Sequence, residues 1–130
     1  MVRAASILQS AVLRAVADRR NLRIHSGMVS DGLLGLYDSG ALADADDAVV
    51  AGVALGTDAL YQACERIAFR EVGYTHAAAT LGRIDSLHAI NSALSVDLLG
   101  QVNGEFLAGK QMSGVGGLPD FILISRSERW

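Results

Sequence analysis

The chain has 130 residues, of which 51% are hydrophobic and 19% charged, and its formal net charge is −3. This balance favours one folded domain with an apolar core and excludes a disordered chain, because disordered chains are poor in apolar residues and rich in charge. A negative net charge also provides no basic surface for nucleic acid.

Helices and strands alternate through the first half of the chain. Apolar residues recur at helical spacing and predict an amphipathic helix over residues 4–19. A short strand is expected over 21–25, and a helix over 30–40 capped by one of its first two residues. The apolar run at 49–55 predicts a buried strand, and a capped helix is expected over 57–68.

The second half of the chain predicts shorter elements. Residues 69–72 indicate a strand, and the alanine-rich stretch 76–81 indicates a helical turn. Strands are expected over 87–90 and 94–99, with 101–106 pairing back in a hairpin. Strands alternating with helices predict an α/β fold with a largely parallel sheet and flanking helices.

The cysteine count and the apolar runs bear on the cellular compartment. Cys64 is the one cysteine and cannot form an internal disulfide, which is typical of a reducing environment. The N-terminal residues lack the apolar run of a signal peptide, and no stretch approaches the roughly 18 uncharged apolar residues of a membrane span. We therefore expect a cytoplasmic protein with no membrane partner.

The block from Ser113 to Gly117 carries the most functional information. Its three glycines, Gly114, Gly116 and Gly117, allow backbone N–H groups to approach a ligand closely. Such a loop suits a phosphate, a carboxylate or the oxyanion that develops during acyl transfer. Most glycine clusters are ordinary turns, so the pattern becomes specific only through its neighbours.

Those neighbours form an ordered series of short motifs: Ile90-Asn-Ser, Val96-Asp-Leu, Gly100-Gln-Val and Ser113-Gly-Val-Gly-Gly-Leu-Pro-Asp-Phe121. Two further motifs precede them, at residues 25–32 and 52–57. Together they resemble the C-terminal domain of the acetyl-CoA hydrolase/transferase family, which includes 4-hydroxybutyrate and butyryl-CoA:acetate CoA-transferases. The resemblance implies a fold of the NagB/RpiA/CoA-transferase type.

The resemblance also implies a domain organisation. Residues 1–121 correspond to part of the family's C-terminal domain, whereas residues 122–130 look like a divergent tail. Family members are considerably longer and carry a separate N-terminal transferase domain. We therefore expect a truncated chain that associates either with that missing domain or with itself.

The family's catalytic nucleophile falls in the motif at residues 25–28. There a glutamate attacks the acyl-CoA thioester and forms covalent intermediates. Gly27 occupies that position in this chain and has no side chain, so the catalytic residue is unassigned. His25 is a candidate for orienting the substrate or acting as a general base, although a lone histidine at a strand end is more often structural.

The resemblance assigns contact with coenzyme A to the glycine loop, at Gly114, Gly116 and Gly117. Two amides beside expected strands, Asn91 and Gln101, are candidates for fixing a polar ligand. The alternative for both is a hydrogen-bonded amide of the core. Coenzyme A is then a substrate or product, and no cofactor is expected to remain bound.

No metal site is expected, because the three histidines lack ligand spacing and the chain has no Cys-x-x-Cys motif. The resemblance favours a fragment of an acyl-CoA hydrolase or CoA-transferase that acts on short-chain acyl-CoA thioesters and a small carboxylate. Without the glutamate, hydrolysis by water is the natural replacement. Two alternatives stay open: a catalytically inactive CoA-binding or interaction module, and a nonfunctional truncated remnant.

Overall fold

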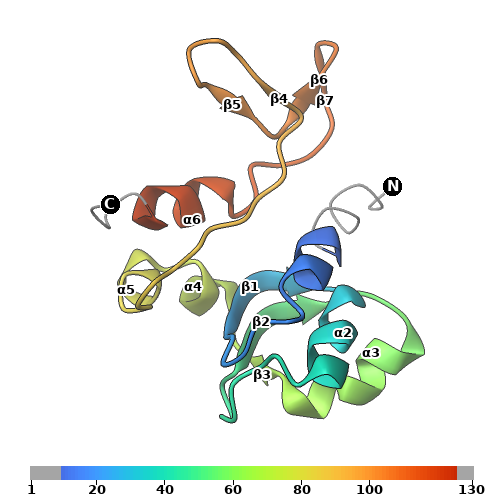
Figure 1. Ribbon diagram of the computed structural model, residues 1–130. Coiled ribbons are helices and arrows are strands. Elements are labelled where there is room, and N and C mark those ends of the chain that lie inside the picture. The colour runs from blue at the N-terminus through green and yellow to red at the C-terminus, as the bar shows by residue number, and fades with distance from the viewer. Residues whose placement is uncertain (1–9, 126–130) are drawn as a thin grey trace. The chain divides into compact units, whose positions relative to one another are not determined.

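A computed structural model describes residues 10–125 of the chain (Figure 1). These residues divide into two compact units, one ending at Thr75 and the other beginning at His76. The predicted N-terminal helix is present over residues 10–15, and its first six residues lie outside the described part. Among the described residues, no helix has the length and apolarity needed to cross a membrane.

The first unit contains a three-stranded parallel sheet in the order β1-β2-β3. Its strands are β1 (Ile24–Val29), β2 (Val49–Ala54) and β3 (Ala68–Phe69). The strand predicted over 49–55 is therefore confirmed. The strand predicted over 21–25 lies further along the chain, because Leu22 makes only an isolated bridge with Leu42 before β1 begins.

Two helical crossovers connect the parallel strands. The first is α2 (Gly32–Ser39), and the second is α3 (Asp58–Gln62), which continues as a 3₁₀ helix, η1 (Ala63–Arg66). Helix α2 ends where predicted because Gly40 adopts a left-handed φ of 65° and donates its N–H to carbonyls of the last turn. Of the strand predicted over 69–72, only Phe69 lies in a strand, because β3 ends there and α4 (Val72–Thr75) begins three residues later.

The core of the first unit lies between the sheet and its two crossover helices. Leu33, Leu36, Val49 and Leu60 are all fully buried within it. Connections between parallel strands are right-handed in nearly all proteins. Because the strands follow the order β1-β2-β3 across the sheet, both connections place their helices, α2 and α3, on the same face of the sheet. Burial of each such side chain contributes about 1.5–3 kcal/mol.

The second unit has short elements and little interior. It consists of helix α5 (Ala78–Leu81), two strand pairs and helix α6 (Leu118–Ser125). The strand pairs are antiparallel: β4 (Ser95–Val96) with β5 (Val102–Asn103), and β6 (Phe106–Leu107) with β7 (Lys110–Gln111). Leu81 is the one buried residue among those described in this unit.

The strand predictions for the second unit need correction. Residues 87–90 form no strand, and the strand predicted over 94–99 is reduced to β4. A strand needs a neighbouring ladder, and within the described chain the stretch 87–93 has none. The predicted return of 101–106 as a hairpin is confirmed for β5 alone, because Phe106 belongs to β6 and pairs with β7 instead. The parallel sheet thus belongs to the first unit alone, and the chain as a whole mixes helices, parallel strands and antiparallel strands.

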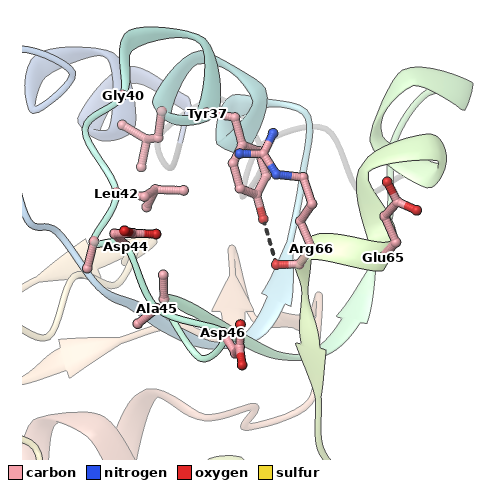
Figure 2. Close-up of a pocket in the computed structure, with 11 residues that line it drawn as sticks. Tyr37, Gly40, Leu42, Asp44, Ala45, Asp46, Glu65 and Arg66 are labelled. Carbon is pink, nitrogen blue, oxygen red and sulfur yellow. Dashed lines mark hydrogen bonds between the residues drawn. The ribbon is translucent and has the colours of Figure 1, made fainter.

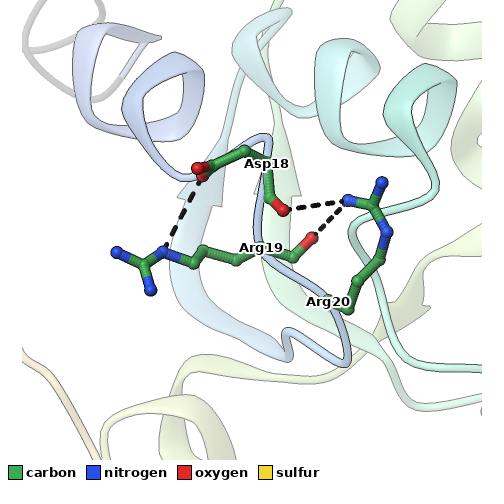
Figure 3. A network of polar contacts seen from close by, with 3 residues as sticks. All are labelled: Asp18, Arg19 and Arg20. Atoms are coloured by element: carbon green, nitrogen blue, oxygen red, sulfur yellow. Dashed lines mark hydrogen bonds and ion pairs between the residues drawn. The ribbon is translucent and has the colours of Figure 1, made fainter.

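The turn after the N-terminal helix is held by local contacts (Figure 3). The Arg20 guanidinium donates to the carbonyl oxygens of Asp18 at 3.2 Å and Arg19 at 2.7 Å. The Arg19 side chain pairs with the Asp18 carboxylate at 3.8 Å, and both are largely exposed. Exposed ion pairs contribute little to stability, so this cluster serves to shape the turn.

Candidate functional site

Gly27, which the resemblance aligns with the family's glutamate, lies in the middle of β1. The register places it between the pairs Ser26–Ala51 and Met28–Val53, opposite Gly52. A β-carbon added to Gly52 would lie 2.7 Å from the Gly27 carbonyl oxygen, so the two backbones approach closely here. The strand position is therefore well defined, but it offers no carboxylate.

His25 is half-buried on β1 and bonds to the backbone of α4. Its Nε2 lies 3.0 Å from the carbonyl oxygen of Thr75, which is fully buried. A carbonyl can only accept, so this bond assigns the proton to Nε2. The contact supports the structural role for His25, and a role as general base stays a prediction.

A polar cluster joins the carboxyl ends of β1 and β2. Asp31 accepts two hydrogen bonds on Oδ1, from the Thr57 N–H at 2.9 Å and the Thr57 hydroxyl at 2.8 Å. Asp31 is the N-cap residue of α2 by position, but its side chain makes no cap bond to that helix. It acts instead on the start of α3, and a β-carbon on Gly56 would clash with it at 2.6 Å.

The hydrogen bonds from Thr57 hold the pKa of Asp31 below its ordinary value of 3.8, the backbone N–H being the larger cause. A depressed carboxyl pKa stabilises the fold above the unfolded-state value, and this stabilisation is lost as the pH falls through the folded-state pKa. We expect Asp31→Asn to melt at a lower temperature than the parent at pH 7 and the difference to shrink below about pH 4. Thermal melts from pH 7 to pH 2 measure this.

Asp38→Asn is the matched control, because Asp38 is an exposed acid on α2. Its melting temperature should follow that of the parent at every pH. A melting difference for Asp31→Asn that is the same at pH 2 as at pH 7 would contradict the expectation.

The remaining predicted site residues lie in the second unit. Asn91 is exposed in the irregular stretch 87–93, and Gln101 lies at the start of β5. The Gln101 side chain donates to Asp97 Oδ2 at 2.9 Å, while Asp97 Oδ1 accepts from the N–H groups of Leu99 and Gln101. Gln101 and Asp97 thus stabilise the turn between β4 and β5. Neither amide lies in a core, and ligand contact by Asn91 and Gln101 stays a prediction.

The glycine loop leads into the first turn of α6, and its three glycines differ in their surroundings. Gly114 has open space around its β position, whereas Gly116 has a left-handed φ of 60°. A β-carbon on Gly117 would clash with the His76 imidazole, which packs edge-on against Phe121 with ring centroids 5.4 Å apart. Gly117 therefore has a packing role, while Gly114 and Gly116 are exposed at a helix N-terminus that favours negative charge.

Asn103 is a residue that the sequence analysis missed. It is half-buried, and its side chain makes hydrogen bonds with the turn that follows β5. The Asn103-Gly104 dipeptide is a turn signal that identifies this position from sequence. Ser113, the first residue of the glycine loop, donates its hydroxyl to the carbonyl oxygen of Gly104 at 3.1 Å.

A separate pocket of about 610 Å³ opens on the first unit (Figure 2). Three carboxylates line it, those of Asp44, Asp46 and Glu65. The Arg66 guanidinium lies 3.7 Å from the centroid of the Tyr37 ring, and the Tyr37 hydroxyl donates to the Arg66 carbonyl at 3.1 Å. Burial raises the pKa of that hydroxyl, so it keeps its proton at neutral pH. With Arg66 also in the lining, the pocket carries one cation against three carboxylates, a net negative charge that disfavours phosphate groups.

Comparison with known proteins defines the class. The model of the acetyl-CoA hydrolase/transferase C-terminal domain matches residues 56–129, so the chain belongs to this family. The match continues beyond residue 121, and the boundaries 1–121 and 122–130 stay a prediction.

Curated relatives are CoA-transferases. The chain is 35% identical over 123 residues to succinyl-CoA:cyclohexane-1-carboxylate CoA transferase of Geobacter metallireducens, covering 88% of this chain and 28% of the relative. It is also 35% identical over 123 residues to 4-hydroxybutyrate coenzyme A transferase of Clostridium kluyveri, covering 88% of this chain and 29% of the relative. The chain thus spans well under a third of these relatives.

The fold also matches a solved structure, again over most of this chain and less than a third of the other. RipA from Yersinia pestis superposes with a TM-score of 0.80 at 27% identity, covering 92% of this chain and 29% of that one.

Proposed function

We propose that this chain provides the CoA-binding part of an acyl-CoA hydrolase or CoA-transferase domain of the NagB/RpiA/CoA-transferase type. Its ligands would be short-chain acyl-CoA thioesters, with coenzyme A as substrate or product and a small carboxylate as the second substrate. The observation that carries the proposal is the exposed glycine loop, Ser113–Gly117, at the start of α6.

The loop has the properties that an anionic ligand requires. Its glycines leave the backbone accessible, and the following helix presents its N-terminus to the same region of the chain. Lys110 is exposed on β7, where a cation can meet a phosphate group. The acidic pocket of the first unit offers no competing site for such a ligand.

A second candidate function, CoA binding without transfer, is favoured by Gly27. The position that carries the nucleophile in the family holds no functional group, whereas the glycine loop is intact. The sequence therefore keeps the loop proposed for binding but lacks the side chain proposed for transfer. The partner that completes a transferase would be the N-terminal domain found in the family or a second copy of this chain, in the cytoplasm.

The glycine loop is tested by adding a side chain where the fold has room for one. Gly114→Val is the sharpest variant, because nothing lies within 4 Å of its β position. We expect it to weaken coenzyme A binding at least tenfold, or about 1.4 kcal/mol, with an unchanged melting temperature. Gly116→Val and Gly117→Val should weaken binding as well, but the φ of Gly116 and the His76 contact of Gly117 add a stability loss. Isothermal titration with coenzyme A measures the effect.

Gly73→Val is the matched control, since its β position is equally open and it lies on α4. It should bind coenzyme A as the parent does. If Gly114→Val also binds with the parent affinity, the loop is a structural turn and the proposed site is wrong.

A further inference from the structure

The side chain of Asn103 forms the centre of a hydrogen-bonded turn. Its Oδ1 accepts from the N–H groups of Glu105 at 3.0 Å and Phe106 at 2.9 Å. Its Nδ2 donates to the Phe106 carbonyl at 2.7 Å and to the Ser95 hydroxyl at 3.1 Å. Both N–H bonds of the amide and both acceptor sites of its oxygen are therefore used, and the turn has one defined shape.

Gly104, inside this turn, contacts the start of the glycine loop. Its carbonyl accepts from the hydroxyl of Ser113, the residue that begins the loop, at 3.1 Å. A β-carbon built on Gly104 would lie 3.2 Å from the end of the Leu118 side chain, so Leu118, the residue that follows the loop, lies near this turn.

Further contacts strengthen the connection between the turn and the loop. The Met112 N–H donates to the Glu105 carbonyl at 2.7 Å, and the Gln111 amide donates to the Ser113 carbonyl at 3.2 Å. Residues 103–105 are half-buried, whereas residues 91–102 and 106–116 are exposed. The turn is therefore the most enclosed part of this region.

We infer that Asn103 is a positioning residue for the glycine loop, acting through the Gly104 carbonyl that accepts from Ser113. The inference rests on the proposed function, in which the loop N–H groups bind coenzyme A. Glycine has the largest backbone freedom of any residue, so a loop with three of them needs external fixing before its donors can converge on a ligand. Preorganised donors bind an anion without having to be ordered at the moment of binding.

The experiment compares three variants of the full 130-residue chain by amide NMR and by titration with coenzyme A. Asn103→Ala removes the amide, and Ser113→Ala removes the hydroxyl that reaches Gly104. Ser95→Ala is the control, because it removes only the bond that points away from the loop.

Two readouts are followed in each variant. The heteronuclear NOE of the Gly114, Gly116 and Gly117 amides reports fast backbone motion of the loop, and the titration reports affinity. We expect Asn103→Ala and Ser113→Ala to lower the loop NOE and to weaken coenzyme A binding at least tenfold. Ser95→Ala should match the parent in both, and the amides of β1 and β2 should not shift in any variant.

The inference would be overturned if the loop NOE of the parent were as low as that of Asn103→Ala. It would also be overturned if Asn103→Ala bound coenzyme A with the affinity of the parent. A control that lowers the loop NOE as much as Asn103→Ala does would also overturn it. If the parent shows no coenzyme A binding while the loop NOE still depends on Asn103, the proposed function fails and the structural coupling stands. The two failures are therefore distinguishable.

Discussion

Leu36→Ala should destabilise the chain by about 2–5 kcal/mol. Leu36 is fully buried on α2, within the core that also contains Val49 and Leu60. Removing its side-chain atoms loses their transfer free energy and leaves a cavity that the packed sheet cannot collapse to fill. Small domains have only about 5–15 kcal/mol of total stability, so the loss is a large fraction of it. Urea denaturation followed by circular dichroism measures the change.

The neighbouring position provides the control. Gly35 is exposed on the same helix, and nothing lies within 4 Å of its β position. Gly35→Ala should therefore be neutral or stabilising by about 0.5–1 kcal/mol, because alanine loses less backbone entropy in a helix. If Leu36→Ala melts within a degree of the parent, the core has been assigned to the wrong face of α2.

No transfer of coenzyme A between acetyl-CoA and a carboxylate is expected from the 130-residue chain. The family resemblance predicts that the covalent route uses a carboxylate at the position of Gly27, and β1 provides only backbone there. Acetyl-CoA is incubated with butyrate, and the butyryl-CoA formed, measured by chromatography, should not exceed the buffer blank. Free thiol is followed separately, because hydrolysis releases the thiol of coenzyme A and transfer does not. The Clostridium kluyveri relative serves as the positive control.

Trapping of the intermediate makes this expectation stricter. Borohydride reduces a glutamyl-CoA thioester, so mass spectrometry after reduction would detect any glutamate that replaces the missing one. A modified glutamate at any position would overturn the expectation. Butyrate-independent thiol release would instead indicate hydrolysis and support the hydrolase alternative.

Hydrophobic patterning predicted the first unit well. The run at 49–55 contains the central strand of the sheet, with Val49 and Ala51 buried, and the helix over 30–40 stops where Gly40 allows a left-handed φ. The strand at 87–90 failed for a physical reason. An apolar pattern predicts which face of a strand would be buried. A strand also needs a neighbouring strand for its backbone hydrogen bonds, and the sequence alone does not reveal whether one is present.

The order of the motifs predicted the family, which the family comparison confirms, whereas the site residues stay a prediction. Of the three loop glycines, Gly114 and Gly116 are exposed and Gly117 is half-buried. Local chemistry could not show that Gly117 packs against His76 or that Asp31 bonds to Thr57, because these partners are 41 and 26 positions away. Such contacts exist only once the chain has folded. Asn103 was missed because its role lies in a turn rather than in a recognised motif.

The sparse interior of the second unit has a consequence for every affinity measured on this chain. One buried side chain, Leu81, leaves little apolar burial to favour the ordered form of residues 76–125. When a binding-competent form is populated for only a fraction of the time, the apparent Kd equals the intrinsic Kd divided by that fraction. A partner that binds only the ordered form should therefore lower the apparent Kd for coenzyme A, even when the partner makes no contact with coenzyme A. The ratio of the apparent Kd values with and without the partner would give the fraction of chains that was binding-competent before the partner was added.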